Sequence, residues 1–283
     1  EKATVPADAD DEAARTRAAL AALDAELGAG WVKSVTPAFT PERAVLIDDR
    51  WATAREDVAR LGSGETDLEA SRRLLAPERF VGLGRAVADH ATWWAKQTKG
   101  SELADAAERT AILTEIAQAA PKAPQAGAPT VRWSEDVAVV TGVAPGSIAA
   151  AVVGDLLAGG ATVVATSSRL THERLEFATT LYREHAAAGA KLWMVPANLS
   201  SYRDVDALAE WIGNDQVVTS GGSTKVVKEA LVPTLLFPFA APRVSGTLAD
   251  AGPAAESQTR LLLWSVERTI AALSAIGTDT HVD

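Results

Sequence analysis

Short apolar runs alternate with longer helical patterns in the second half of the chain. The apolar runs cover residues 137–140, 162–166, 192–195 and 234–239, and a further one begins at Thr280. The first helical pattern ends near residue 158. The later ones cover residues 171–188, 201–212 and 254–276. Continuous apolar runs are typical of strands buried on both faces, and strand–helix alternation produces right-handed crossovers between parallel strands. The sequence therefore predicts an α/β fold around a parallel sheet.

The first 119 residues differ from this pattern. They are rich in Ala, Leu, Glu and Arg, which are strong helix formers, and we expect a mainly helical scaffold region over residues 1–119. Residues 120–130 contain Pro121, Pro124 and Pro129, and proline cannot continue a helix. We expect a linker there, followed by a second domain over residues 131–283.

Composition excludes several classes of protein. The formal net charge of −10 leaves little to neutralise a phosphate backbone, so we expect no nucleic-acid partner. The chain has no cysteine, which excludes disulfides and cysteine-based zinc sites, and its four histidines show no metal-ligand spacing. Its apolar runs are too short to span a bilayer. We expect a cytoplasmic protein with no membrane partner and no metal.

A glycine turn joins the first apolar run to the first helix. It contains Thr141, Gly142, Gly146, Ser147 and Ile148. Its two glycines have the spacing of the TGxxxGxG turn of short-chain dehydrogenases, although Ile148 stands where the third glycine would be. Such a turn lets the backbone approach a pyrophosphate and directs helix N-terminal amides at it. The pattern predicts a dinucleotide site in a Rossmann-like, doubly wound sheet; the alternative is a turn that only connects two elements.

The end of the second apolar run predicts which dinucleotide binds. Ser167, Ser168 and Arg169 lie about twenty residues after the glycines, where NAD-specific proteins usually place an acidic residue on the ribose 2′-hydroxyl. Two hydroxyls and a guanidinium suit a 2′-phosphate instead. We therefore expect NADPH as the cofactor, with Arg169 on its 2′-phosphate. In the alternative interpretation, Arg169 is a solvated loop residue and the serines cap the next helix.

The ends of the third and fourth runs complete the expected site. Asn198 and Leu199 are expected beside the adenine, although an Asn before a helix is also a common cap. The small residues Ala240 and Ala241, together with Phe239, would let the second ribose pass.

These segments resemble the ketoreductase region of fungal and mycobacterial type I fatty acid synthases. The resemblance rests on residues 140–142, 146–148, 166–169 and 237–241, and it extends upstream to residues 45–61. It implies a 3-oxoacyl-ACP reductase region that reduces a 3-oxoacyl chain carried on acyl carrier protein to the 3-hydroxyacyl product, with hydride from NADPH. It also implies contacts with other domains of the synthase and a homo-oligomer, a hexamer in the bacterial form.

The chain departs from this resemblance in two places. Ser265 stands where the family has an Asn that supports the proton relay, and the family's catalytic Ser, Tyr and Lys follow the fifth strand, past Asp283. Neither Tyr182 nor Tyr202 has a Lys four residues later. Because reduction needs an acid to protonate the alkoxide, we expect a truncated, short-chain-dehydrogenase-type domain that supplies the cofactor half, with no catalytic residue and no activity alone.

Two other functions stay open. Residues 1–119 could act purely as a structural scaffold within a synthase. The whole chain could also be a non-catalytic, dehydrogenase-like protein that binds NADP without turnover. Residues 221–225, Gly-Gly-Ser-Thr-Lys, resemble a phosphate loop but lack its full frame, so we expect a mobile insertion there.

Overall fold

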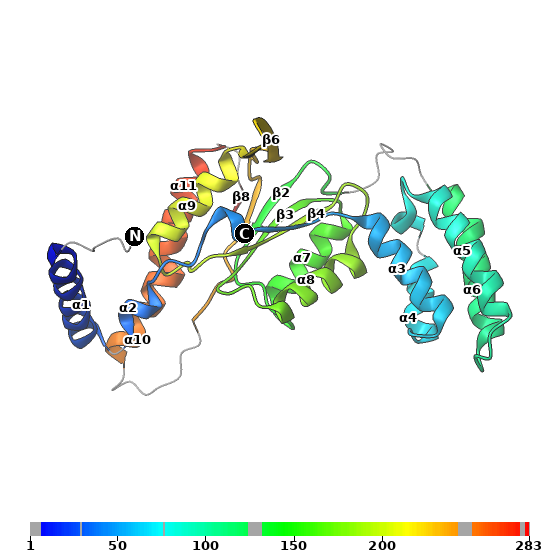
Figure 1. Ribbon diagram of the computed structural model, residues 1–283, viewed down its shortest axis with the longest axis horizontal. Coiled ribbons are helices and arrows are strands. Elements are labelled where there is room, and N and C mark those ends of the chain that lie inside the picture. The colour runs from blue at the N-terminus through cyan, green and yellow to red at the C-terminus, as the bar shows by residue number, and fades with distance from the viewer. Residues whose placement is uncertain are drawn as a thin grey trace.

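The computed structural model describes residues 7–28, 30–75, 77–123, 132–242, 251–277 and 281–282. Within these ranges, a six-stranded sheet lies at the centre of an elongated molecule, with a helical unit at one end and the N-terminal helix α1 (Ala7–Leu27) at the other (Figure 1). In sheet order the strands are β1 (Val45–Ile47), β4 (Lys191–Pro196), β3 (Thr162–Ser167), β2 (Val137–Val140), β7 (Leu235–Phe237) and β8 (His281–Val282). All neighbouring pairs are parallel except β1 and β4. The predicted α/β architecture is confirmed.

The sheet is buried on both faces, as the apolar runs predict. Successive side chains of a strand point to opposite faces, so Ala138 and Val140 contact one helical layer and Val139 contacts the other. The first layer contains α7 (Ile148–Ala158) and α8 (His172–His185). The second contains α9 (Tyr202–Gly213) and α11 (Ser265–Ser274). Helices therefore cover both faces of the sheet, and the loops at the ends of the strands remain accessible.

Hydroxyl caps explain where these helices begin. The side chains of Ser147, Thr171 and Ser201 accept hydrogen bonds from backbone N–H groups in the first turns of α7, α8 and α9. Each cap satisfies a donor that has no partner inside the helix. The caps therefore place three helix N-termini at the carboxyl ends of β2, β3 and β4.

The expectation of a wholly parallel sheet is wrong at one edge. β1 pairs antiparallel with β4, with Leu46 opposite Trp193. Its residues precede the proline-rich segment, so the part of the chain expected to be helical contributes a strand to the sheet. Only three residues pair, and an antiparallel edge strand on a mostly parallel sheet needs no crossover helix. A three-residue apolar run carries too little pattern to predict this.

Four helices follow β1 and form a separate unit at one end of the molecule (Figure 1). They are α3 (Arg50–Ser63), α4 (Leu68–Arg72), α5 (Gly84–Lys99) and α6 (Ala106–Ala119), joined through the short 3-10 helices Arg73–Leu75 and Pro77–Phe80. Val58, Leu61, Val87, Leu113 and Ile116 form its core. This core is distinct from the two that flank the sheet, so the unit has an apolar interior of its own.

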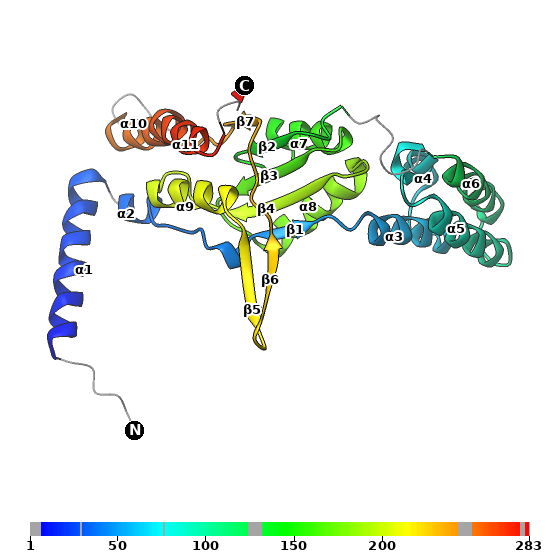
Figure 2. The same ribbon diagram turned by 90° about the horizontal axis from the view of Figure 1, so that it is seen from above.

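The insertion expected around residue 221 is a β-hairpin. β5 (Gln216–Ser220) and β6 (Ser223–Lys228) pair antiparallel through a two-residue turn. Gly221 and Gly222 have φ values of 59° and 82°, which a type I′ turn requires. The hairpin projects away from the sheet (Figure 2). The expected insertion is thus a β-hairpin, and a phosphate loop is excluded because a strand rather than a helix follows the glycines.

The last helical segment is nearly continuous, as predicted. It consists of α10 (Ala251–Thr259), a π-helical turn (Arg260–Trp264) and α11. In the part of the chain that the structure describes, no helix combines the length and apolarity needed to cross a bilayer. The same ranges hold no cluster of three or more His, Asp or Glu side chains suited to a metal ion.

Candidate functional site

The glycine turn lies where the connections of the sheet change direction. β2 is flanked by β3 on one side and by β7 on the other, so the chain leaves it in one direction and returns on the opposite side. The backbone N–H of Thr141 donates to the Phe237 carbonyl at 3.0 Å, and that of Val143 donates to the Thr166 carbonyl at 3.0 Å. The turn therefore spans the carboxyl ends of both neighbouring strands. In open α/β sheets, ligands bind at this position.

Glycine is required at position 142 because two loops approach each other closely there. Its φ is 73°, and a Cβ built on it would lie 2.7 Å from the Cα of Ala240. Any side chain would push the turn away from the segment that follows β7. The two segments are also joined by a hydrogen bond of 2.9 Å from the Ala240 N–H to the Thr141 hydroxyl. Thr141, Gly142 and Ala240 thus form one packed contact at the floor of the site.

Gly146 has the same backbone conformation but an open neighbourhood. Its φ is 71°, and, apart from its chain neighbours, no described atom lies within 4 Å of an ideal Cβ. Ser147 follows and caps α7, accepting a hydrogen bond of 3.1 Å from the Ala150 N–H. Ile148, in the first turn of this helix, is 73% exposed. The turn is therefore packed on the Gly142 side and accessible on the Gly146 side, at a helix terminus whose dipole favours anions.

The three polar residues after β3 lie on the same edge of the sheet. Ser167 is buried, and its hydroxyl donates to the Arg169 carbonyl at 3.1 Å, which shapes the turn. Ser168 and Arg169 are exposed. Arg169 forms no ion pair with another described residue. Its guanidinium is therefore free of carboxylates in the described chain.

Asn198 makes contacts that the sequence did not reveal. Its side-chain nitrogen donates to the carbonyls of Ser34 at 2.7 Å and Thr36 at 2.8 Å, and its side-chain oxygen accepts from the Ser200 N–H at 3.2 Å. The amide therefore holds an N-terminal segment against the carboxyl end of β4. Leu199 is buried beside it, and its carbonyl accepts a hydrogen bond from the Ser265 hydroxyl.

The remaining expected residues follow β7. Phe239 is 37% exposed and stacks on Phe237 with ring centroids 6.0 Å apart. Ala241 is exposed. Together with Ala240 they form the side of the site opposite Arg169. All thirteen residues singled out from the sequence lie at or just after the carboxyl ends of β2, β3, β4 and β7.

A groove borders the Arg169 side of this edge. Its volume is about 750 Å³, and Ser168, Arg169 and Asn198 form one wall. The other wall comes from residues 32–43 and Asp24, far away in the sequence. No motif in those N-terminal residues indicates a ligand. Their two basic side chains, Lys33 and Arg43, are ten positions apart and Glu42 lies between them, so composition gives no signal either.

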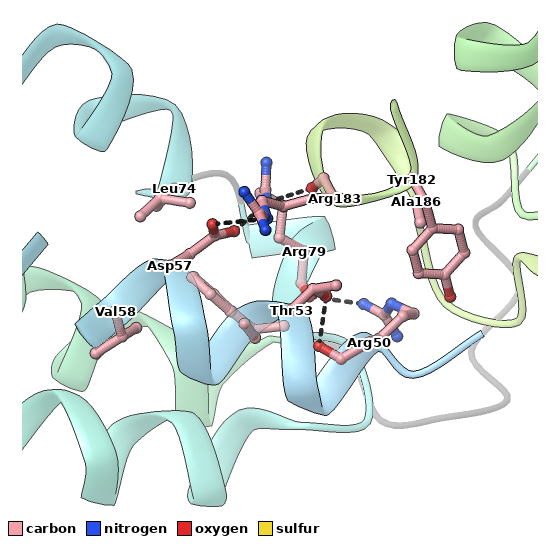
Figure 3. Close-up of a pocket in the computed structure, with 11 residues that line it drawn as sticks. Arg50, Thr53, Asp57, Val58, Leu74, Arg79, Tyr182, Arg183 and Ala186 are labelled. Carbon is pink, nitrogen blue, oxygen red and sulfur yellow. Dashed lines mark hydrogen bonds and ion pairs between the residues drawn. The ribbon is translucent and has the colours of Figure 1, made fainter. Parts of the chain in front are cut away.

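A second, much smaller cavity lies between the helical unit and α8 (Figure 3). Arg79 donates to Asp57 at 3.1 Å and to the carbonyl of Arg183 at 2.7 Å, at the end of α8. Burial raises the pKa of Asp57 to about 6, although Arg79 and Arg183 oppose the shift. The cavity volume is about 20 Å³, room for little more than one water molecule. This cluster joins the helical unit to α8.

Neither tyrosine has the surroundings of a proton donor. The Tyr182 hydroxyl is buried and donates to the Ala190 carbonyl at 3.0 Å, and burial raises its pKa. The Tyr202 ring packs under the guanidinium groups of Arg260, at 4.7 Å, and Arg268, at 5.2 Å. Both side chains serve packing.

Curated relatives of this chain are fungal fatty acid synthase alpha subunits. The chain is 33% identical over 144 residues to fatty acid synthase subunit alpha of Candida parapsilosis, which covers 50% of this chain and 7% of the relative. It is 38% identical over 103 residues to the Schizosaccharomyces pombe subunit, covering 36% and 6%. The Saccharomyces cerevisiae subunit is 39% identical over 82 residues, covering 29% and 4%. No protein-family profile matches the chain. The similarity therefore joins part of this chain to a small part of much longer proteins.

Proposed function

We propose that this chain is the NADPH-binding part of the ketoreductase region of a fatty acid synthase. The observation that carries the proposal is the position of the glycine turn at the switch point of the sheet, with Arg169 on the same edge. The parallel strands in chain order β2, β3, β4, β7 and β8 take the spatial order 3-2-1-4-5, which matches the Rossmann dinucleotide-binding arrangement.

The residues present fit a dinucleotide phosphate cofactor. The open side of the turn at Gly146 and the first amides of α7 suit the pyrophosphate, because they combine free space with helix-end donors. Arg169 suits the 2′-phosphate, since no described carboxylate pairs with it. Bound NADPH would supply the hydride that converts a 3-oxoacyl thioester into its 3-hydroxyacyl product.

The role proposed for the chain is to hold the cofactor. The buried Tyr182 and the packed Tyr202 are both engaged by other groups, so we assign no proton-transfer step to them. Acyl carrier protein, other domains of the synthase and further copies of the chain are the proposed partners, in a cytoplasmic assembly. The alpha-subunit relatives support this setting because they are fatty acid synthase components.

A scaffold function for the helical unit is compatible with this proposal. Arg79 joins Asp57 of α3 to the carbonyls of Arg183 and Glu184 at the end of α8. Helix ends leave their last carbonyls without partners, and a cation there is favourable. This contact supports a structural role: the helical unit is held against the sheet domain and contributes no group at the carboxyl ends of the parallel strands.

Titration of the chain with NADPH and NADH tests the proposed function. We expect NADPH to bind more tightly than NADH, and Arg169→Glu to abolish NADPH binding because it places a carboxylate beside the 2′-phosphate. Arg85→Glu is the matched control, since Arg85 is an exposed arginine on α5, in the helical unit. Unchanged NADPH preference in Arg169→Glu would refute the assignment.

A further inference from the structure

An N-terminal segment, residues 31–43, crosses the carboxyl end of β4; we call it the arm. The buried carboxylate of Asp204 accepts hydrogen bonds from the N–H groups of Ala38 at 2.8 Å and Phe39 at 3.0 Å. Phe39 is buried and meets the ring of Trp211 edge-on, with centroids 6.2 Å apart. With the two hydrogen bonds from Asn198, these contacts fix the arm on the sheet domain.

The arm brings positive charge to the groove beside Arg169. Lys33 and Arg43 line the groove together with Arg169, and all three are exposed. Asp24 is the one carboxylate among the lining residues, and its oxygen accepts a hydrogen bond of 2.8 Å from the Val32 N–H. The groove is therefore locally basic in a chain whose formal net charge is −10.

These basic groups are available to a ligand. Lys33 forms no ion pair with another described residue, and Arg43 makes one long hydrogen bond of 3.3 Å, to the Ala38 carbonyl. A phosphate monoester carries nearly two negative charges and three acceptor oxygens, so it can use several cationic donors at once. A basic groove of this kind matches a phosphate monoester better than a neutral ribose.

We propose that the arm is the second wall of the adenosine subsite, and that Lys33 and Arg43 join Arg169 in binding the 2′-phosphate of NADPH. This inference rests on the proposed function, because the carboxyl end of β3 is where the adenosine ribose of a bound dinucleotide lies. Asn198 is then a positioning residue: it holds the arm that carries two of the phosphate ligands.

The test compares NADPH, NADH and adenosine 2′,5′-bisphosphate binding to the chain and to the double variant Lys33→Ala/Arg43→Ala. Hydrogen bonds to charged groups predict about a tenfold or larger loss of NADPH and bisphosphate affinity. NADH affinity should stay within about twofold of that of the unaltered chain, because NADH lacks the phosphate. Retained NADH binding also shows that the variant is folded. Lys96→Ala/Arg85→Ala, on α5, is the matched control.

Three outcomes separate the arm from the proposed function. A selective loss of NADPH and bisphosphate binding in the arm variant supports the inference. Equal NADPH affinity in the arm variant and the unaltered chain overturns the inference and leaves the proposed function standing. Failure of the unaltered chain to bind NADPH or NADH refutes the proposed function, and the role of the arm with it.

Discussion

The two sides of the carboxyl edge are built in different ways. The glycine turn is local: seven residues, 141–147, connect β2 to α7, and Gly142 and Ser147 fix its geometry. The arm depends on contacts between residues more than 160 positions apart, such as Asn198 with Ser34. The turn can be found from spacing alone, whereas the arm exists only once the chain has folded. The predictions below test how far each side controls binding.

The largest effect is expected at the turn. Gly142→Ala would place a Cβ 2.7 Å from the Ala240 Cα, at a φ of 73° that alanine rarely adopts. We expect complete loss of NADPH binding and a loss of unfolding free energy of about 1–3 kcal/mol, measured by titration and urea unfolding. Gly146→Ala is the matched comparison, because its φ is similar but its Cβ meets open space. Equal effects of the two substitutions would contradict the packing argument.

Removal of the carboxylate that fixes the arm should affect NADPH binding less than Gly142→Ala does, but stability at least as much. Asp204 is buried and accepts the N–H groups of Ala38, Phe39 and Asn198, so Asp204→Ala leaves three donors unpaired. We expect about 2–4 kcal/mol less unfolding free energy in urea. Trypsin should also cleave faster after Lys33 and Arg43.

Asp206→Ala is the control for that prediction. Asp206 lies on the same helix but is exposed, where it pairs with Arg268, and such surface pairs contribute little. Unchanged trypsin cleavage within the arm of Asp204→Ala would show that other contacts hold it.

The contact between the helical unit and α8, which Asp57 and Arg79 form with Arg183, is another long-range contact. Its contribution to stability should depend on pH. Burial raises the pKa of Asp57 from its usual range to about 6 in the folded chain. The folded state then binds more protons than the unfolded state between about pH 4 and pH 6, so the Asp57 contribution to stability falls as pH rises through that window.

Asp57→Asn tests this pH dependence. Asparagine does not titrate, so the fall in unfolding free energy from pH 4 to pH 6 should be smaller in this variant than in the unaltered chain. Urea unfolding at both pH values measures the difference. Asp89→Asn serves as a control, since Asp89 is an exposed carboxylate on α5, in the same helical unit. An identical pH slope in Asp57→Asn would contradict a raised pKa.

The smallest effect is expected from Asn198→Ala. This substitution removes two hydrogen bonds to the arm but leaves the contacts of Asp204 and Phe39. We expect a loss of NADPH affinity of a few-fold, with NADH affinity unchanged, measured by titration. A loss shared equally by both nucleotides would instead indicate that Asn198 contacts the adenine, as its position in the sequence suggests.

The sequence predicted what short segments determine by themselves. The runs that became β2, β3 and β4 are apolar throughout, and the helices between them begin at hydroxyl caps. The turn after β2 was predicted from the spacing of its two glycines, and their positive φ values explain why glycine stands there. These signals lie within a few residues of the structure they specify.

What the sequence did not predict depends on distant partners. β1 is identified as a strand by its pairing with β4 in the folded chain, because a run of three apolar residues fits a helix as well. Asn198 was expected beside the adenine, but the carbonyls that its amide binds come from the arm. Lys33 and Arg43 belong to no sequence motif. Their place in the groove follows from the path of the arm across β4.

A structure of the chain with bound NADPH tests the central claim most directly. We expect the pyrophosphate against the backbone amides of residues 142–148 and the 2′-phosphate within hydrogen-bonding distance of the Arg169 guanidinium. A cofactor found elsewhere on the molecule, or one whose adenosine end lies away from Arg169, would contradict the account.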